Sequence, residues 1–177
     1  MASAGRGGGG STRANGANLA LEERPETLDV QRGLTEVGTA VPGFDAGRFP
    51  EEAMDIFFRI QAAWARGDLD PVRGLLAPEV RRELQRDLDA LKAEGKINRL
   101  ENIAVRRTQI QEAWVEAGSA FVGILFLANL LDYTVEERTG RLLSGSRDTP
   151  VRFAEFWTFL RPAGGSSWQL TAIQQIG

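Results

Sequence analysis

The chain has 177 residues with neither cysteine nor histidine, and its 21 Lys and Arg against 24 Asp and Glu give a net charge of −3. The missing residue types exclude a disulfide scaffold, a thiolate nucleophile, a Ser-His-Asp triad and an HExxH zinc site. The nearly balanced charge argues against a general nucleic-acid-binding protein, which normally carries a basic excess.

The composition divides the chain into three parts. Residues 1–16 contain six glycines and, after Met1, no large apolar side chain, which predicts a flexible tether. Residues 17–48 mix scattered leucines and valines with charges. We expect an arm with a short helix around 27–37, which either packs on the domain, meets a membrane or partner, or has no fixed structure. Residues 49–177 have the length of a common single domain.

Helices are predicted at the start of this domain. From Pro50 to Arg66 apolar residues recur every three or four positions, proline suits the first turn, and Gly67 ends the helix. Asp70 is the predicted N-cap of a short helix through residue 76. A third helix is expected from about 78 to 94, ended by Gly95.

Beyond Gly95 the apolar period changes to two, which predicts strands at 100–116, 119–134, 151–161 and 168–176, with 135–149 as a hairpin loop. Helices followed by strands with short connections predict an α+β fold with helices on one face of an antiparallel sheet. The strands 119–134 and 151–161 are apolar on both faces. The face away from the helices therefore needs a cover: a partner, a lipid, or curvature that closes a pocket. The longest apolar run, residues 120–131, is too short to cross a bilayer.

Five segments resemble a known family in order and spacing. They read FFRIQAAWARGDLDPVRGLLAPE, NIAVRRTQIQEAW, LLDYTVEERTG, FAEFWTFLRP and WQLTAIQQ. From about residue 42 to 175 the chain resembles the C-terminal domain of subunit 44 of the mitochondrial inner-membrane protein translocase, the Tim44-like domain, as found in bacterial relatives.

The resemblance implies a cystatin-like or nuclear-transport-factor-two-like cone, with N-terminal helices packed on a strongly curved, four-stranded antiparallel sheet. It also implies a non-enzymatic domain peripheral to a membrane, which in bacteria is the inner membrane. The expected partner is an anionic membrane lipid such as cardiolipin, or a membrane-protein complex for which the domain is a scaffold in protein transport or membrane-protein assembly. No cofactor, metal or nucleic acid is expected.

The sequence departs from the family at two points. Bacterial relatives often carry an N-terminal membrane segment, and none precedes the Gly-rich part of this sequence; either such a segment is missing from it or this member is soluble. Ala77 stands where the family usually has a threonine, so this helix start lacks a side-chain cap.

Two sets of residues are candidate sites. Large apolar side chains either form the core or line a pocket for an acyl chain: Phe57, Trp64, Phe126, Phe153 and Trp157. Basic side chains form either an ion-paired, solvated surface or a patch for anionic lipid or phosphate: Arg81, Arg82, Arg86, Lys92 and Lys96. Residues 71–107 hold nine basic and six acidic residues, which leaves +3 in this segment and −6 elsewhere.

Glu155 lies among aromatic residues on a predicted apolar strand. A buried carboxylate is costly unless it is paired, so we expect an ion pair with Arg106, Arg107 or Arg152, or a place at the sheet edge. The alternative is a general base of raised pKa in a pocket, which would make the chain a small-molecule-binding protein or an isomerase- or dehydratase-like enzyme on the same cone fold. A third hypothesis is an interaction domain that dimerises through its sheet.

Overall fold

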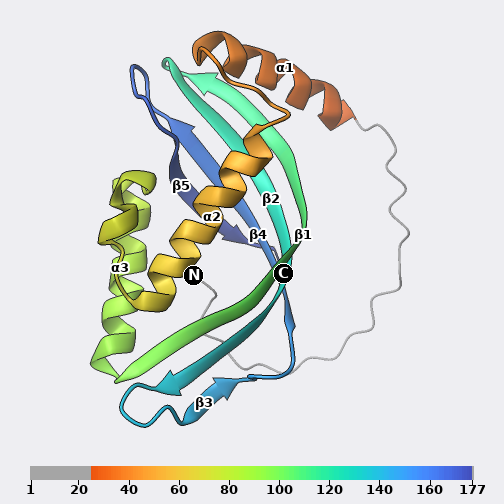
Figure 1. Ribbon diagram of the computed structural model, residues 1–177. Coiled ribbons are helices and arrows are strands. Elements are labelled where there is room, and N and C mark those ends of the chain that lie inside the picture. Colours follow the sequence, from red (N-terminus) through yellow and green to blue (C-terminus); the bar gives the residue numbers. More distant parts are fainter. Residues whose placement is uncertain (1–24, 177) are drawn as a thin grey trace.

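The computed structural model describes residues 25–176 (Figure 1), so the predicted tether at 1–16 and the beginning of the arm lie outside the described residues. The elements in chain order are α1 (Pro25–Ala40), α2 (Phe49–Arg66), the 3-10 helix η1 (Asp70–Leu75), α3 (Pro78–Ala93), β1 (Lys96–Glu116), β2 (Ser119–Glu136), β3 (Leu142–Gly145), β4 (Val151–Arg161) and β5 (Gln169–Gln175). The predicted α+β class, with helices first and strands afterwards, is confirmed.

The strands form one antiparallel sheet in the order β1-β2-β4-β5, and the short β3 pairs with β2. The expectation of four strands missed β3, which lies in the segment interpreted as a hairpin loop. The expectation of a strongly curved sheet is also wrong, because the sheet is not strongly curled. The central β2–β4 ladder runs from Ala120 to Leu130 without a bulge, so nothing there bends it sharply; the register shifts lie in the β1–β2 ladder, near the end of β2–β3 and in the β4–β5 ladder.

The helix ends follow local chemistry. Gly67 ends α2 in the left-handed conformation at φ 69°, and its N–H donates to the carbonyl of Trp64. Ala77 is the N-cap of α3 and provides no side-chain cap. The prediction that Asp70 is an N-cap is wrong: Leu69 holds that position, and Asp70 lies within η1.

Helix α1 is longer than the short helix expected around 27–37 and packs on the end of β1 (Figure 1). Gly33 permits this approach, since a Cβ there would stand 1.9 Å from the carbonyl oxygen of Ala113. Val37, one turn further on, is fully buried in the main core. The arm therefore takes part in the packing of the domain.

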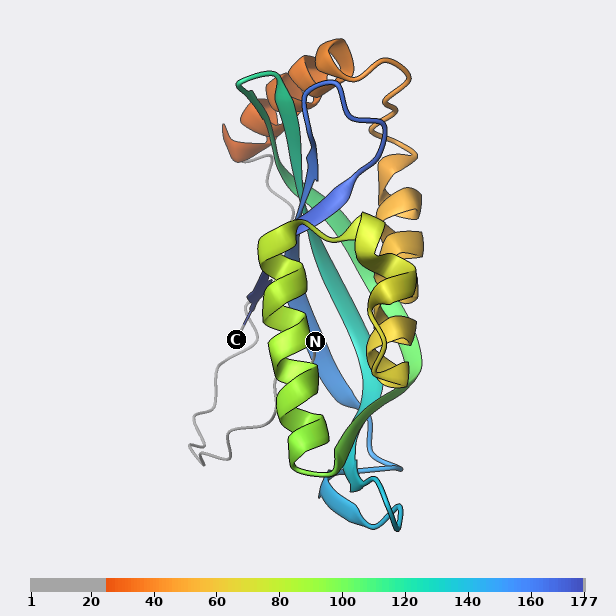
Figure 2. The same cartoon turned by 90° about the vertical axis from the view of Figure 1, so that its left-hand side faces the viewer.

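The main core lies between the helices and one face of the sheet, called the inner face here. Helix α2 crosses the strands diagonally in Figure 1, and Figure 2 shows α3 next to it in the same layer. Both helices contribute to one buried cluster with the inner face of β2 and β4, where every second residue is buried from Phe153 to Phe159. This packing leaves the opposite, outer face of the sheet outside the main core.

Candidate functional site

Four of the five predicted pocket residues meet in the core. The Phe57 ring of α2 stacks on Phe126, with ring centroids 4.8 Å apart, and contacts Trp157 at 5.0 Å and Phe153 at 5.8 Å. All four rings are at most 6% exposed. Because the rings occupy this space themselves, an acyl chain would have to displace them.

The fifth residue, Trp64, belongs to a separate polar network near the end of α2. Its indole N–H donates to Oδ1 of Asn98 at 3.0 Å, and the Asn98 amide donates to Asp132 at 2.9 Å. Asn98 is 8% exposed, so this amide is a satisfied buried polar group that joins α2 to β1 and β2. Sequence reasoning missed Asn98, because a single asparagine in a strand carries no signal of its inward orientation.

Glu155 is fully buried on the inner face of β4 and forms no ion pair with a described residue, so the expected pairing with Arg106, Arg107 or Arg152 is wrong. Its carboxyl accepts hydrogen bonds from Trp157 Nε1 at 2.7 Å and from the Gln175 amide. Burial raises the pKa of the carboxyl from its ordinary 4.5 to about 7, although both hydrogen bonds act to lower it.

Gln61 is a second buried polar residue that sequence reasoning missed. It lies on α2 with 2% exposure, and neither its amide oxygen nor its amide nitrogen has a hydrogen-bond partner within the described residues. Its position, four residues after Phe57 and on the same helix face, is the only sequence signal of its burial. An orphaned amide of this kind destabilises the fold.

The structure separates the five predicted basic residues. Arg81 and Arg82 line an open pocket of about 470 Å³ at the start of α3, whereas Arg86 does not line it. Lys92 donates to the carbonyl of Gly67 at 2.8 Å, and Lys96 pairs with Glu94 at 2.5 Å. Three of the five thus have nearby partners, since Arg81 also pairs with Asp70 at 3.1 Å, and the pocket gains Arg73 from η1.

The outer face of the sheet carries an apolar stripe across the middle strands. Its rings and aliphatic chains are half-buried: Trp114, Phe121, Leu125, Leu127, Phe156 and Leu160. Trp114 and Phe121 stack with centroids 4.8 Å apart and ring planes at 2°, and the Phe156 ring lies over Gly123. Polar residues such as Arg107, Gln109 and Thr158 flank the stripe, so this face is mixed rather than continuously apolar.

Comparison with known families decides the relationship. The Tim44-like domain matches residues 30–175, which is most of the chain. The chain belongs to the Tim44-like domain family. The resemblance found in the sequence is therefore confirmed, and the matched region includes most of α1.

Among solved structures, this Tim44-like domain is similar to the intermembrane-space region of the chloroplast protein ARC6. The two share 10% sequence identity with a TM-score of 0.50, over 77% of this chain and 99% of the ARC6 chain. At this identity the likeness shows the fold alone. No curated protein matches the sequence.

Tim44-like domains are generally non-catalytic and are related to membrane-associated import and scaffold domains. Within residues 25–176, no helix of this member has the length and apolar character to cross a bilayer. The same residues contain no cluster of acidic side chains suited to a metal ion. The family relationship suggests a domain that works beside a membrane.

Proposed function

We propose that this Tim44-like domain is a non-catalytic module that attaches to an anionic membrane surface through the arginines of η1 and the first turns of α3. The observation that carries the proposal is the pairing pattern of the basic residues. Arg73, Arg82 and Arg86 are exposed, and within the described part of the chain none of them forms an ion pair or a side-chain hydrogen bond.

The net charge of the sequence does not by itself orient this attachment. Residues 71–107 carry +3 against −6 in the remaining chain, but residues 71–95, which include all of α3, hold five basic and five acidic residues. The unpaired arginines, and not the net charge, therefore provide the attraction to an anionic surface. A basic side chain close to an anionic membrane contributes about 1 kcal/mol, so three arginines give weak, salt-dependent binding. Membership in a family with membrane-associated relatives supports the same assignment.

Vesicle co-sedimentation tests this function. We expect the full chain to bind vesicles containing phosphatidylglycerol, to leave phosphatidylcholine vesicles unbound, and to dissociate as salt is raised. The double variant Arg82→Gln/Arg86→Gln should lose most of this binding. A matched control is Arg32→Gln/Arg59→Gln, which removes the same charge from two arginines that sit in exposed ion pairs on α1 and α2. Equal binding of both variants, or equal binding to both lipids, would contradict the proposal.

A second candidate function is a scaffold that docks a protein on the outer face of the sheet. The half-buried stripe around Phe121 and Leu125 favours it, because apolar surface of this kind is typical of interaction sites. The chain lacks cysteine, so a Leu125→Cys variant carries a unique crosslinking group, with Ser144→Cys on the exposed β3 as its control. Specific crosslinking from position 125 to one membrane protein would support the scaffold; identical patterns from both positions would refute it.

The enzymatic alternative has no comparable observation in its favour. Glu155 is fully enclosed in the packed core, and the open pocket at the start of α3 does not include it. A general base has to reach the proton that it removes, which this position does not allow without opening the core.

A further inference from the structure

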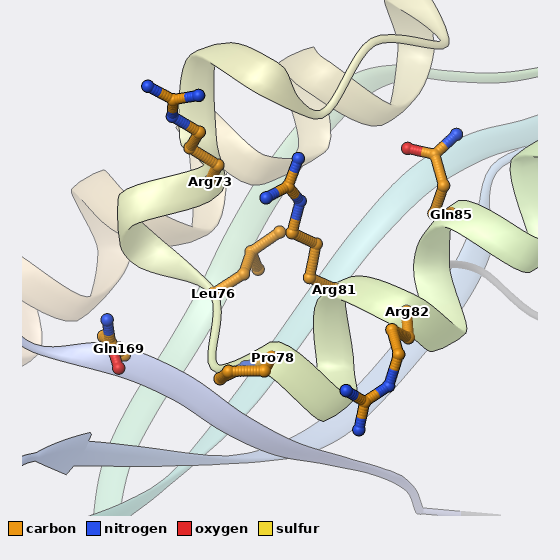
Figure 3. A pocket seen from close by; sticks show the side chains of 7 residues that line it. All are labelled: Arg73, Leu76, Pro78, Arg81, Arg82, Gln85 and Gln169. Atoms are coloured by element: carbon orange, nitrogen blue, oxygen red, sulfur yellow. The ribbon is translucent and has the colours of Figure 1, made fainter.

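The open pocket at the start of α3 brings together side chains from three separate elements (Figure 3). Arg73 comes from η1, Arg81 and Arg82 come from the first turns of α3, and Gln169 is the first residue of β5. Two of the lining residues are apolar: Leu76 in the connection between η1 and α3, and Pro78 at the start of α3. The pocket has about 470 Å³ and is open to solvent.

The charge of this pocket is strongly positive. None of its seven lining residues is acidic, although acidic residues outnumber basic ones in the whole chain. Asp70 holds Arg81 through a single contact of 3.1 Å from one terminal nitrogen, which leaves other N–H groups of that guanidinium free. Glu79, in the first turn of α3, does not line the pocket and forms no ion pair with a described residue.

The backbone adds to this positive character without deciding it. The N–H of Ala77 donates to the carbonyl of Leu170, and Pro78 has no N–H. The N–H groups of Glu79 and Val80 stand at the start of α3, where a helix offers no intrahelical acceptor, and no side chain caps them. They lie at the positive end of the helix dipole. The three guanidinium groups provide the donors for a ligand, and the helix start adds positive charge character to the same place.

We infer that this pocket binds a phosphate group. Three guanidinium groups offer more donors than one carboxylate can accept, whereas a phosphate has several anionic oxygens that match the planar fork of arginine. Only two of the seven lining residues are apolar and the pocket is open, so it does not enclose an acyl chain. Gln169 can donate a further hydrogen bond, while the Gln85 amide already donates to Asp89 at 2.9 Å. Arg73 and Arg82 are exposed, and their guanidinium groups point away from each other in Figure 3, so phosphate binding requires both side chains to turn towards the pocket.

The phosphate can come from a lipid headgroup or from a soluble phosphate compound. The first source rests on the proposed membrane function, and the second does not. Two readouts on the intact chain separate them: calorimetric titration with inorganic phosphate against chloride at matched ionic strength, and co-sedimentation with phosphatidic acid vesicles. The pocket variant is Arg73→Gln/Arg82→Gln, and the matched control is Arg32→Gln/Arg59→Gln, which removes two arginines of α1 and α2 that lie outside the pocket.

We expect inorganic phosphate to bind the unaltered chain and the control alike, and to bind the pocket variant at least tenfold more weakly. Loss of phosphatidic acid binding in the pocket variant as well identifies a lipid headgroup. Phosphate binding that depends on the pocket, with no vesicle binding by any form, supports the pocket with a soluble ligand and refutes the membrane proposal. Equal weakening in both variants, or no phosphate binding by the unaltered chain, overturns the inference and leaves vesicle binding to be judged by its own test.

Discussion

The buried carboxyl of Glu155 makes the stability of this domain depend on pH in an unusual direction. The protonated form is favoured in the fold, since burial raises the pKa of Glu155 from 4.5 to about 7. Between these two pH values the folded chain keeps a proton that the unfolded chain has released. The stabilising contribution is therefore complete below pH 4.5 and is lost as the pH rises through 7, with a total change of roughly 3 kcal/mol.

The substitution Glu155→Gln removes the charge and keeps the shape. Its amide oxygen still accepts from Trp157, and its amide nitrogen faces the Gln175 side chain, whose own amide can turn to present its oxygen. We expect the variant to match the unaltered chain near pH 5 and to exceed it at pH 8 by roughly 2 kcal/mol.

Urea unfolding followed by tryptophan fluorescence at pH 5, 6, 7 and 8 measures this effect, because the chain has four tryptophans. Glu116→Gln, at the exposed end of β1, is the control for the loss of one negative charge. The reasoning is refuted if Glu155→Gln keeps the pH slope of the unaltered chain, or if it is the less stable of the two at pH 8.

Three further substitutions test the packing around the candidate sites by the same unfolding assay. Gln61→Met replaces an amide that has no hydrogen-bond partner among residues 25–176 by an apolar chain of similar length and should stabilise the fold by about 1 kcal/mol; a loss of stability instead would show that the amide is satisfied in solution. Asn98→Ala leaves the indole N–H of α2 without its acceptor and should cost about 2–3 kcal/mol, whereas an unchanged midpoint would exclude a structural role for the network. Gly123→Ala places a Cβ 2.3 Å from the Phe156 ring and should cost about 1–3 kcal/mol, while the control Gly74→Ala, with open space around it, should be close to neutral.

The long elements could be predicted because their side chains repeat with a clear period. The strand from Val151 to Arg161 has the bounds that alternation indicates, and the helix that ends before Gly67 begins one residue from its predicted start. The strand β3 could not be predicted, since all four of its residues are exposed and no pattern of burial marks it. The prediction of a strongly curved sheet failed for a different reason. Sheet curvature depends on where bulges interrupt the ladders, and the residues of a single strand do not show where these bulges lie.

The polar interior depends on contacts that sequence patterns do not encode. The position of Glu155 among aromatic residues predicted its burial correctly, but the expected partners Arg106, Arg107 and Arg152 were wrong. Its actual donors lie two and twenty residues further along the chain, and the second one reaches it only because β5 pairs with β4 in that register. Electrostatic reasoning from the sequence alone favours an arginine wherever an acid is buried, whereas the fold satisfies this acid with neutral N–H groups and a raised pKa.

The same limit explains why the basic residues divided as they did. Charge counting placed Arg81, Arg82, Arg86, Lys92 and Lys96 in one patch, because they follow one another along the chain. Lys92 lies at the far end of α3, about ten residues or 15 Å along the helix axis from Arg82, and Lys96 is the first residue of β1. Each of the two lysines has a partner nearby. Arg73 comes from a different element and completes the cluster, because the turn between η1 and α3 folds the chain back on itself. The anion binding that we propose for this domain therefore depends on that turn, and the charge of α3 as a whole, where acidic residues alternate with basic ones, does not determine it.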